Sequence, residues 1–321
     1  MATRQAELLE RLEASARAGL PACGGWIASK DATRFTFLCS DLMRERAQYK
    51  LRIIDQLLDE NYGNWNETFY NLYFRTLGDK KNQEAFLELS RRVTYKNILR
   101  ERLTPNAIEA MLLGASGLLE LYPEDRYVAL LKQEFRHLSA KYDIEPMSVE
   151  QWNLHEIRPA NHPVLRLSQA AAFFLQDDFL MDRILRCRTE EDIHALFCIE
   201  SGHYWHTHYT PGAESEERPK RLGHFKASMI GINLVATLQL AYSLKMGKEE
   251  LYEQAINLLE RMKPEDNRYI RLWQSMGVRP RDAAQTQALL QLSTVYCAAA
   301  RCKECPIAQR MMMELELKKK D

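Results

Sequence analysis

Three cysteines near the carboxyl end of the sequence have the spacing most typical of metal chemistry. Cys297, Cys302 and Cys305 lie in the segment YCAAARCKECPI, with the pattern C-x4-C-x2-C. The C-x2-C step lets two thiolates reach one ion from a single turn, and thiolates suit zinc and iron–sulfur clusters. The pattern therefore predicts a zinc or iron–sulfur site, with a fourth ligand from elsewhere in the chain such as Cys198 or His206.

The residues around these cysteines favour thiolate formation. Pro306 follows the third cysteine and predicts the start of a helix, whose positive end lowers the pKa of a nearby thiol. Arg301, Lys303 and Arg310 would act in the same direction. The C-x2-C-Pro step resembles part of the iron–sulfur loop of helical DNA-repair glycosylases, but Met311 stands where that loop has its fourth cysteine. The alternative is three reduced thiols packed in a helix–turn–helix.

A second candidate cluster combines histidines with aromatic residues in the segment SGHYWHTHYT. His203 and His206 would share one face of a helix, His208 lies one turn on, and Trp205 is among the aromatic residues between them. Such a cluster can bind metal, shuttle protons or stack on a nucleobase. The alternative is a helix end where rings pack and histidines bond to the backbone. It is favoured because no carboxylate follows at an H-E-x-x-H type of spacing.

A third candidate lies in the segment IRPANHPVLRLSQAAAFF, where two prolines hold the chain extended before a predicted helix. Asn161 or His162 would cap the helix that begins at Pro163. Arg158 and Arg166 could converge on an anion at the N-terminus of that helix. The alternative is that each arginine pairs with a nearby carboxylate.

Two more basic segments complete the candidate binding residues. They are RPKRLGHFK (218–226), which contains Lys220 and Arg221, and RRVTYKNILRER (91–102). A charge run is usually a solvated face, but these segments and their aromatic neighbours would form a nucleic-acid surface if folding brings them together. The sequence contains no phosphate-binding glycine loop, nucleophile elbow or kinase motif, so no catalytic residue is assigned.

The elements that must position these side chains are helices. Apolar residues recur at helical spacing, and the 321 residues include only 13 Gly and 11 Pro. We expect helices at about 5–18, 41–61, 64–77, 82–92, 94–102, 105–117, 124–141, 163–176, 178–187, 189–198, 224–246, 248–262, 267–276, 282–298 and 302–321. The predicted fold is therefore mainly α, a multi-helix bundle or array, with at most a minor strand near residues 33–39.

The expected organisation has three parts. They are an N-terminal helix and irregular segment (1–40), a helical subdomain (41–145), and a second helical subdomain (146–321) that carries the cysteine cluster. The boundary near 145 precedes an irregular segment that is rich in proline. No period of 20–50 residues repeats, so a solenoid is not predicted.

Composition limits the class of protein and its compartment. Lys plus Arg and Asp plus Glu each number 44, so the net charge is zero, which argues against a dominant nucleic-acid or anionic-membrane footprint. Hydrophobic residues at 46% and charged residues at 27% are typical of a globular protein. Seven cysteines, an odd number, are expected to stay reduced in the cytoplasm. The apolar stretch 228–244 is interrupted by polar residues, so it predicts a buried core helix and no membrane partner.

Several blocks in fixed order give the chain a family resemblance. They are GNWNETFYNLYFRTLGDKKNQEAFLEL, EAMLLGASGLL, RPANHPVLRLSQAAAFF, YWHTHYT, INLVATLQLAY and YCAAARCKECPI. Over roughly residues 40–310 the sequence resembles domain-of-unknown-function family 2851, which is common in Bacteroidetes. The family name implies no established activity.

The resemblance also carries an expectation about organisation. Members of the family have an upstream part whose Asp…Glu-x-His/Lys pattern resembles PD-(D/E)xK nucleases, and residues 1–40 resemble only the tail of that part. The resemblance thus implies a helical partner module without the metal-binding carboxylates of a nuclease.

Three functions remain open from the sequence. The first is a non-catalytic helical module that binds nucleic acid or a partner protein. The second is a metal-dependent enzyme that uses the C-terminal cysteines with His206 or His208 nearby, or a structural protein stabilised by the metal. The third is a structural protein in which cysteines and histidines merely fill the core. The binding module is the preferred interpretation, because it accounts for the basic segments and the nuclease-like relatives.

Overall fold

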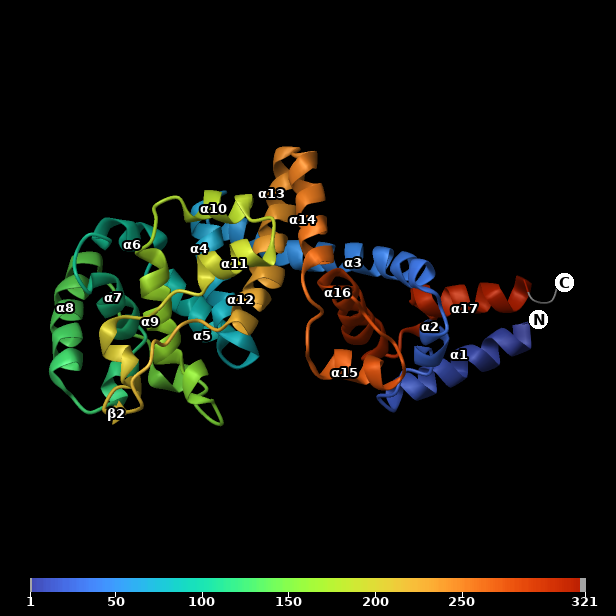
Figure 1. Ribbon diagram of the computed structural model, residues 1–321, viewed down its shortest axis with the longest axis horizontal. Coiled ribbons are helices and arrows are strands. Elements are labelled where there is room, and N and C mark those ends of the chain that lie inside the picture. Colours follow the sequence, from blue (N-terminus) through green and yellow to red (C-terminus); the bar gives the residue numbers. More distant parts are fainter. Residues whose placement is uncertain (1, 318–321) are drawn as a thin grey trace. The chain divides into compact units, whose positions relative to one another are not determined.

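The computed structural model describes residues 2–317, and helices make up most of them (Figure 1). Within this range the strands are β1 (His208–Thr210) and β2 (Ala213–Glu214), which form one two-stranded antiparallel sheet. The mainly α fold is therefore confirmed.

The strand expected near residues 33–39 is wrong. Those residues lie within α3 (Ala32–Glu60), a single helix of 29 residues. Phe35, Leu38 and Leu42 recur at helical spacing along it and are all buried. The burial of this stripe outweighs the strand preference of the Thr and Phe residues in the segment.

The chain divides into two compact units whose boundaries differ from those expected near residues 40 and 145. Unit 1 combines the chain up to Arg52 with the chain from Glu253 onward, and unit 2 spans Ile53–Tyr252. The difference arises because α3 and α14 (Glu249–Arg261) run across the two boundaries, and because the two ends of the sequence belong to one unit.

Unit 1 brings the first and last helices of the chain together. Besides parts of α3 and α14, it contains α1 (Ala2–Arg17), α2 (Gly24–Ala28), α15 (Arg268–Ser275), α16 (Ala283–Gln291), η6 (Leu292–Cys297), η7 (Cys302–Glu304) and α17 (Pro306–Leu317). Helix α1 packs on α17, η7 and η6. The last predicted helix begins at Pro306 rather than residue 302, and residues 318–321 of that prediction lie outside the described residues.

Unit 2 is a helical array with an aromatic core. It contains α4 (Trp65–Leu77), α5 (Asp79–Arg92), α6 (Tyr95–Glu101), α7 (Ala107–Ala115), η1 (Leu118–Leu121), α8 (Arg126–Tyr142), η2 (Val149–Gln151), η3 (Pro159–Asn161), α9 (Pro163–Phe174), α10 (Leu180–Arg186), α11 (Glu190–Phe197), η4 (His203–His206), β1, β2, α12 (His224–Ile230), η5 (Gly231–Val235) and α13 (Ala236–Met246). The rings of Tyr73, Phe173 and Phe197 stack at the centre, with the first two centroids 4.7 Å apart. Aromatic pairs of this kind stabilise a core beyond the area that they bury.

Local signals set several helix ends. Asn64 caps α4 by accepting hydrogen bonds from the backbone N–H groups of Asn66 and Glu67, as its side chain predicts. The predicted start at Pro105 is wrong, because α7 begins at Ala107. Pro105 occupies instead the second position of a tight turn, and the next residue, Asn106, takes the left-handed conformation that such a turn requires.

The most apolar helical run crosses the interior of unit 2. The run His224–Met246, which comprises α12, η5 and α13, is long and apolar enough to span a membrane by length and composition. However, 72% of its most apolar window is buried inside the protein. The run is therefore buried like a core helix. This agrees with the prediction made from the polar residues that interrupt its apolar stretch.

Helices α7 and α8 approach closely at a glycine. A Cβ atom at Gly114 would lie only 2.1 Å from the ring carbon Cγ of Phe135. The lack of a side chain at this position therefore lets the aromatic ring pack against the α7 backbone, and a larger residue would force the two helices apart.

We predict that Gly114→Ala destabilises the protein by about 1–3 kcal/mol, because the added methyl group overpacks this contact. Urea unfolding followed by circular dichroism measures the change. Gly25→Ala is the matched control, since a Cβ there meets nothing within 4 Å. Equal stability of the two variants would contradict the predicted contact.

Candidate functional sites

Four cysteines from the two ends of the sequence line one small cavity in unit 1. Cys23, which precedes α2, joins Cys297, Cys302 and Cys305 there. The rest of the lining is mainly apolar and comprises Leu12, Ala16, Pro21, Ala22, Leu292, Tyr296 and Ala308. All seven cysteines of the chain are free thiols. The sequence pattern therefore identified three members of a four-thiol cluster, which we call the thiol cluster.

Backbone elements fix the four thiols from different directions. Cys297 ends η6, a π-helical segment, and Cys302 begins the short helix η7. Cys305 follows η7 directly and precedes α17, so Cys302 and Cys305 flank a single tight turn. This confirms the helix predicted to start at Pro306.

Burial controls the ionisation of the thiol cluster. It raises the pKa of Cys23 to about 12 and that of Cys305 to about 11, and it also raises the pKa of Cys297. Cys302 also raises the pKa of the other three thiols, and Cys305 raises those of Cys23 and Cys297, because negative charges in one apolar cavity repel each other. The isolated thiols are therefore protonated at neutral pH.

The helix N-terminus and nearby cations were expected to lower the pKa of the thiols, and only part of this effect is present. Backbone N–H groups at the start of α17 hydrogen-bond to Cys305 and lower its pKa, but burial outweighs them. Arg301 pairs with Glu304, and Arg310 pairs with Asp41 at 3.2 Å. The charges of these two arginines are thus already compensated by carboxylates.

The fourth thiol is a residue that the sequence pattern did not select. Cys198 and His206, the ligands suggested for the fourth position, belong to unit 2, whereas Cys23 lies within the thiol cluster itself. Among residues 2–317, no group of three or more His, Cys, Asp or Glu side chains is arranged as the ligands of one metal ion. The cavity that the four thiols line has a volume of only about 20 Å³.

Polar contacts connect the helices of unit 1 near this cavity and at the far end of α17. Tyr296 donates a hydrogen bond to Glu45 of α3 at 2.8 Å. On the opposite end of α17, Glu314 accepts hydrogen bonds from the Trp26 indole at 3.0 Å and from Lys30 at 2.7 Å. These bonds connect the N-terminal helices to α17, which carries no covalent link to them.

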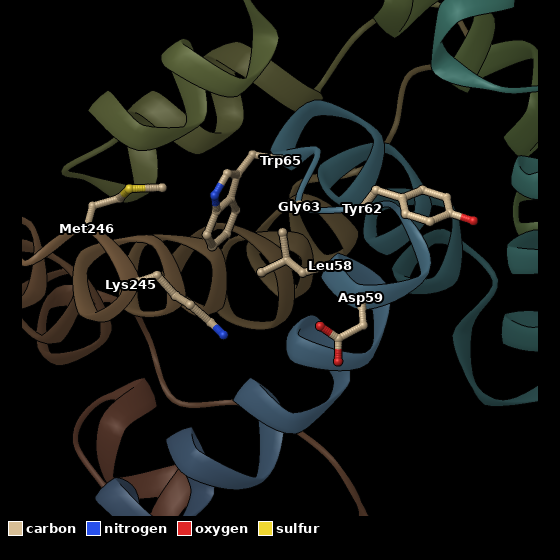
Figure 2. A pocket seen from close by; sticks show the side chains of 7 residues that line it. All are labelled: Leu58, Asp59, Tyr62, Gly63, Trp65, Lys245 and Met246. Atoms are coloured by element: carbon tan, nitrogen blue, oxygen red, sulfur yellow. The ribbon is translucent and has the colours of Figure 1, made fainter.

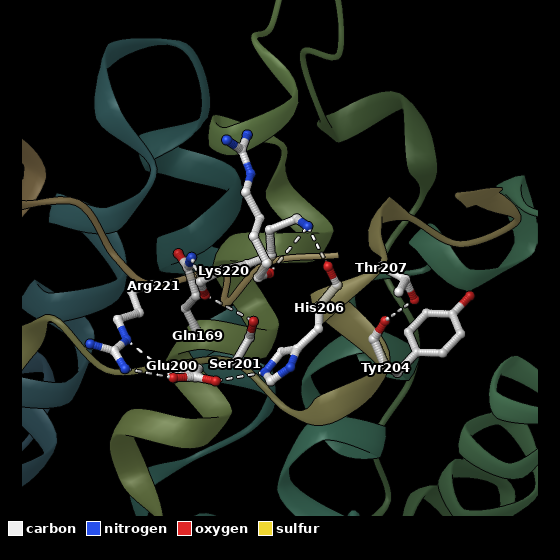
Figure 3. A network of polar contacts seen from close by, with 9 residues as sticks. Gln169, Glu200, Ser201, Tyr204, His206, Thr207, Lys220 and Arg221 are labelled. Atoms are coloured by element: carbon white, nitrogen blue, oxygen red, sulfur yellow. Dashed lines mark hydrogen bonds and ion pairs between the residues drawn. The ribbon is translucent and has the colours of Figure 1, made fainter. Parts of the chain in front are cut away.

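The histidine segment forms an ion-pair network in unit 2 (Figure 3). The Nε2 atom of His206 lies 2.7 Å from a carboxylate oxygen of Glu200, whose other oxygen pairs with Arg221 at 3.0 Å. His203 and His206 share one face of η4 as predicted, with ring centroids 5.2 Å apart. Glu200 thus supplies the carboxylate that the sequence spacing did not show.

Lys220 is buried within a cage of backbone carbonyl groups (Figure 3). Its ammonium group donates hydrogen bonds to the carbonyls of His206 at 2.6 Å, Glu216 at 3.3 Å and Arg218 at 3.4 Å. Only 4% of the residue is exposed. Lys220 therefore holds a loop closed, and its charge does not reach the surface.

The aromatic members of the histidine segment pack inward. Trp205 is fully buried and donates its indole N–H to Glu109 at 2.6 Å. The ring of Tyr204 stacks between Tyr127 and His208, at centroid distances of 4.1 and 4.2 Å. These rings have the packing expected of a helix end rather than of an exposed stacking platform.

The arginine–proline corner is also largely internal. Arg166 is 6% exposed and donates hydrogen bonds to Asn161 at 2.7 Å and to Gln169 at 2.9 Å. Arg158 is exposed, so the two arginines do not present one anion site to solvent. His162 caps α9 by accepting a hydrogen bond from the Val164 N–H.

The model of a family described as a protein of unknown function (DUF2851) matches residues 3–268. This chain belongs to the DUF2851 family. No curated protein and no solved structure matches it. The resemblance expected over roughly residues 40–310 is thus confirmed, although the DUF2851 match begins earlier and ends before Cys297.

One surface pocket of the DUF2851 chain was missed by sequence reasoning (Figure 2). It has a volume of about 440 Å³ and is lined by Leu58, Asp59, Tyr62, Gly63, Trp65, Lys245 and Met246. Tyr62 is 99% exposed and adopts a left-handed conformation at the end of α3. Lys245 already pairs with Asp55 at 2.7 Å, so we assign the pocket no reaction.

We predict that His162 makes the protein sensitive to mild acid. Burial lowers its pKa to about 4, whereas the unfolded chain has the ordinary value of 6.5. Between these values only the unfolded state takes up a proton, so stability falls as the pH drops from 6.5 towards 4. His162→Asn keeps a side chain that can cap α9 but takes up no proton in this pH range. The free energy of unfolding of the variant should therefore fall by about 1–2 kcal/mol less than that of the natural chain.

The measurement is urea unfolding at pH 7 and at pH 4.5 for the natural chain and the variant. His155→Asn, which replaces an exposed histidine, is the matched control and should keep the natural pH dependence. An identical loss of stability in the His162→Asn protein would contradict this role of the half-buried ring.

Proposed function

We propose that this DUF2851 chain is a non-catalytic helical module whose unit 1 is closed by a metal centre on the thiol cluster. One observation carries the proposal: Cys23 and the three C-terminal cysteines line the same cavity. None of the four forms a disulfide, so all four thiols are available to ligate a metal as thiolates. Four cysteines are also the full ligand set of a structural metal site.

The physical role of the metal would be to join the two ends of the sequence. Cys23 lies before α2, whereas Cys297, Cys302 and Cys305 lie between η6 and α17. A metal that binds only the folded arrangement adds its binding free energy to the stability of that arrangement. Binding also requires the four protonated thiols to release their protons, so metal affinity rises with pH.

The donor set favours a structural over an enzymatic role. A catalytic metal keeps an open position for water or substrate and usually has histidine or carboxylate ligands. The cavity is lined by four thiols and apolar side chains, and the histidines considered for an enzyme, His206 and His208, belong to unit 2. A cytoplasmic location fits this proposal, because a reducing compartment keeps thiols available for metal.

The test is metal analysis of the untagged full chain purified under anaerobic conditions. We expect about one metal centre per chain, and we expect Cys23→Ser and Cys302→Ser each to lower the metal content at least tenfold. Removal of the metal should lower the melting temperature by about 5–10 °C, since a site filled at 100 times its Kd contributes about 2.7 kcal/mol.

Cys39→Ser is the matched control, because Cys39 is a buried thiol of unit 1 outside the cavity. It should retain the metal. A metal content well below one centre per chain, in protein that is folded by circular dichroism, would contradict the proposal.

A second proposal is that the module binds a macromolecule, and an apolar groove favours a protein partner. Phe37, Met313 and Leu317 of unit 1 line one groove of about 290 Å³, and each is about 60% exposed. Exposed apolar side chains that gather in this way are typical of interaction surfaces. By contrast, Lys220 is buried and Arg221 pairs with Glu200, so few of the predicted cations are left to bind phosphate.

We therefore predict only weak binding of the full chain to labelled DNA and RNA. Fluorescence anisotropy at low salt should give a Kd no tighter than about 10⁻⁶ M, as for non-specific contacts. Arg158→Ala should change this value by less than twofold. Tight binding that weakens steeply with salt and with Arg158→Ala would instead favour a nucleic-acid partner.

A further inference from the structure

The apolar groove of unit 1 takes its side chains from α3 and α17. It has a volume of about 290 Å³ and includes Phe37 from α3 and Met313 and Leu317 from α17. We call it the α17 groove. Met313 and Leu317 are four residues apart, so they lie on one face of their helix. The groove therefore presents apolar side chains from two helical walls.

Polar bonds hold the two walls of the α17 groove together. Glu314 of α17 accepts hydrogen bonds from the Trp26 indole at 3.0 Å and from Lys30 at 2.7 Å. Arg310 of α17 pairs with Asp41 of α3 at 3.2 Å. These contacts fix the spacing of the walls before a partner binds, and such preorganisation lowers the free energy cost of binding.

The exposed side chains of the α17 groove match the way in which a groove receives an amphipathic helix. Phe37, Met313 and Leu317 are 59%, 60% and 63% exposed. An amphipathic helix lays its apolar face into a hydrophobic groove through residues at i, i+3, i+4 and i+7. A partner that covers these three side chains therefore needs an apolar face of its own.

Cations outnumber anions at the α17 groove. Lys30, Arg34 and Arg310 line it, together with one carboxylate, that of Glu314. In the sequence, Leu317 is followed by three lysines and one aspartate. This part of the chain therefore has an excess of positive charge, although the net charge of the whole chain is zero.

Other carboxylates near the groove are used by bonds within unit 1. In addition to the two that bridge the walls, Glu316 accepts a hydrogen bond from Gln5 of α1 at 2.7 Å, and Asp31 accepts one from the Arg34 backbone N–H at 2.9 Å. The guanidinium group of Arg34 meets Asp31 only at 3.7 Å, which is longer than a hydrogen bond, and its side chain is 71% exposed. Arg34 can therefore donate charge-assisted hydrogen bonds to a carboxylate of a partner.

We propose that the α17 groove binds an acidic amphipathic helix of a partner protein. The apolar face of that helix packs on Phe37, Met313 and Leu317, and its carboxylates lie near Arg34. This inference rests on the proposed protein-binding role and specifies the chemistry of the partner. A second copy of the chain fits less well, because two grooves of the same positive charge repel each other.

The experiment measures binding of the full chain to two labelled helical peptides by fluorescence anisotropy. The peptides share apolar residues at i, i+3, i+4 and i+7, and their other positions are glutamate in one and lysine in the other. We expect the acidic peptide to bind at least tenfold more tightly than the basic one, and its affinity to fall as salt is added.

Three variants locate the binding site. Met313→Glu should weaken binding of the acidic peptide at least tenfold, and Arg34→Glu should reduce the preference for the acidic over the basic peptide at least fivefold. Phe225→Glu is the matched control, because Phe225 is an apolar side chain of unit 2 that is 63% exposed. It should leave both affinities unchanged, and circular dichroism checks that each variant is folded.

The outcomes separate this inference from the role on which it rests. Equal binding of the two peptides that is lost in Met313→Glu overturns the acidic partner but leaves the protein-binding groove standing. Failure to bind either peptide, or binding that Met313→Glu does not weaken, overturns both. Binding to phosphatidylserine vesicles in place of the peptides also overturns both. A dimer in light scattering that Met313→Glu dissociates identifies a second copy as the occupant and overturns the acidic partner.

Discussion

The organisation of unit 1 depends on contacts between residues at opposite ends of the sequence. Helix α1 packs on α17, and the Trp26 and Lys30 side chains both bond to Glu314. The thiol cluster lies within the same set of contacts, since Cys23 comes from the first part of the chain and its three companions from the last. Because the cluster lies at the ends of α2, η6 and α17, the proposed metal would link the stability of these elements to one another.

Unit 2 obtains its stability by a different route. Its centre is a stack of aromatic rings from α4, α9 and α11. Two of its buried cations form hydrogen bonds within the unit. Lys220 donates hydrogen bonds to backbone carbonyl groups of a loop, and Arg166 donates hydrogen bonds to Asn161 and Gln169. Charged groups that are desolvated in this way are retained only when hydrogen bonds compensate them. Lys220 and Arg166 therefore serve the interior of the fold, whereas Arg158 of the same segments is exposed.

The sequence predicted most helices because their signals are local. Apolar spacing located α4, α8 and α14 within a few residues, and Asn64 capped its helix as expected. The cysteine spacing likewise identified three of the four clustered thiols. Cys23 was missed because its membership depends on the packing of α1 and α2 against the other end of the chain, which no local pattern records. The partners of Arg166, Lys220 and His206 were missed for the same reason, since each bond depends on the tertiary arrangement of the chain.

The π-helical segment η6 has a consequence for how this part of the chain can vary. Its hydrogen bonds span five residues instead of four, as between Ala298 and Ser293 at 2.9 Å, so it accommodates one residue more than a regular helix. Loss of one residue from η6 would therefore restore α-helical winding and leave Cys297 facing in nearly the same direction, whereas loss of one residue from the regular helix α16 would rotate it by about 100° away from the cavity. Natural relatives that keep the four thiols can therefore lack the extra residue of η6, but they should conserve the length of α16.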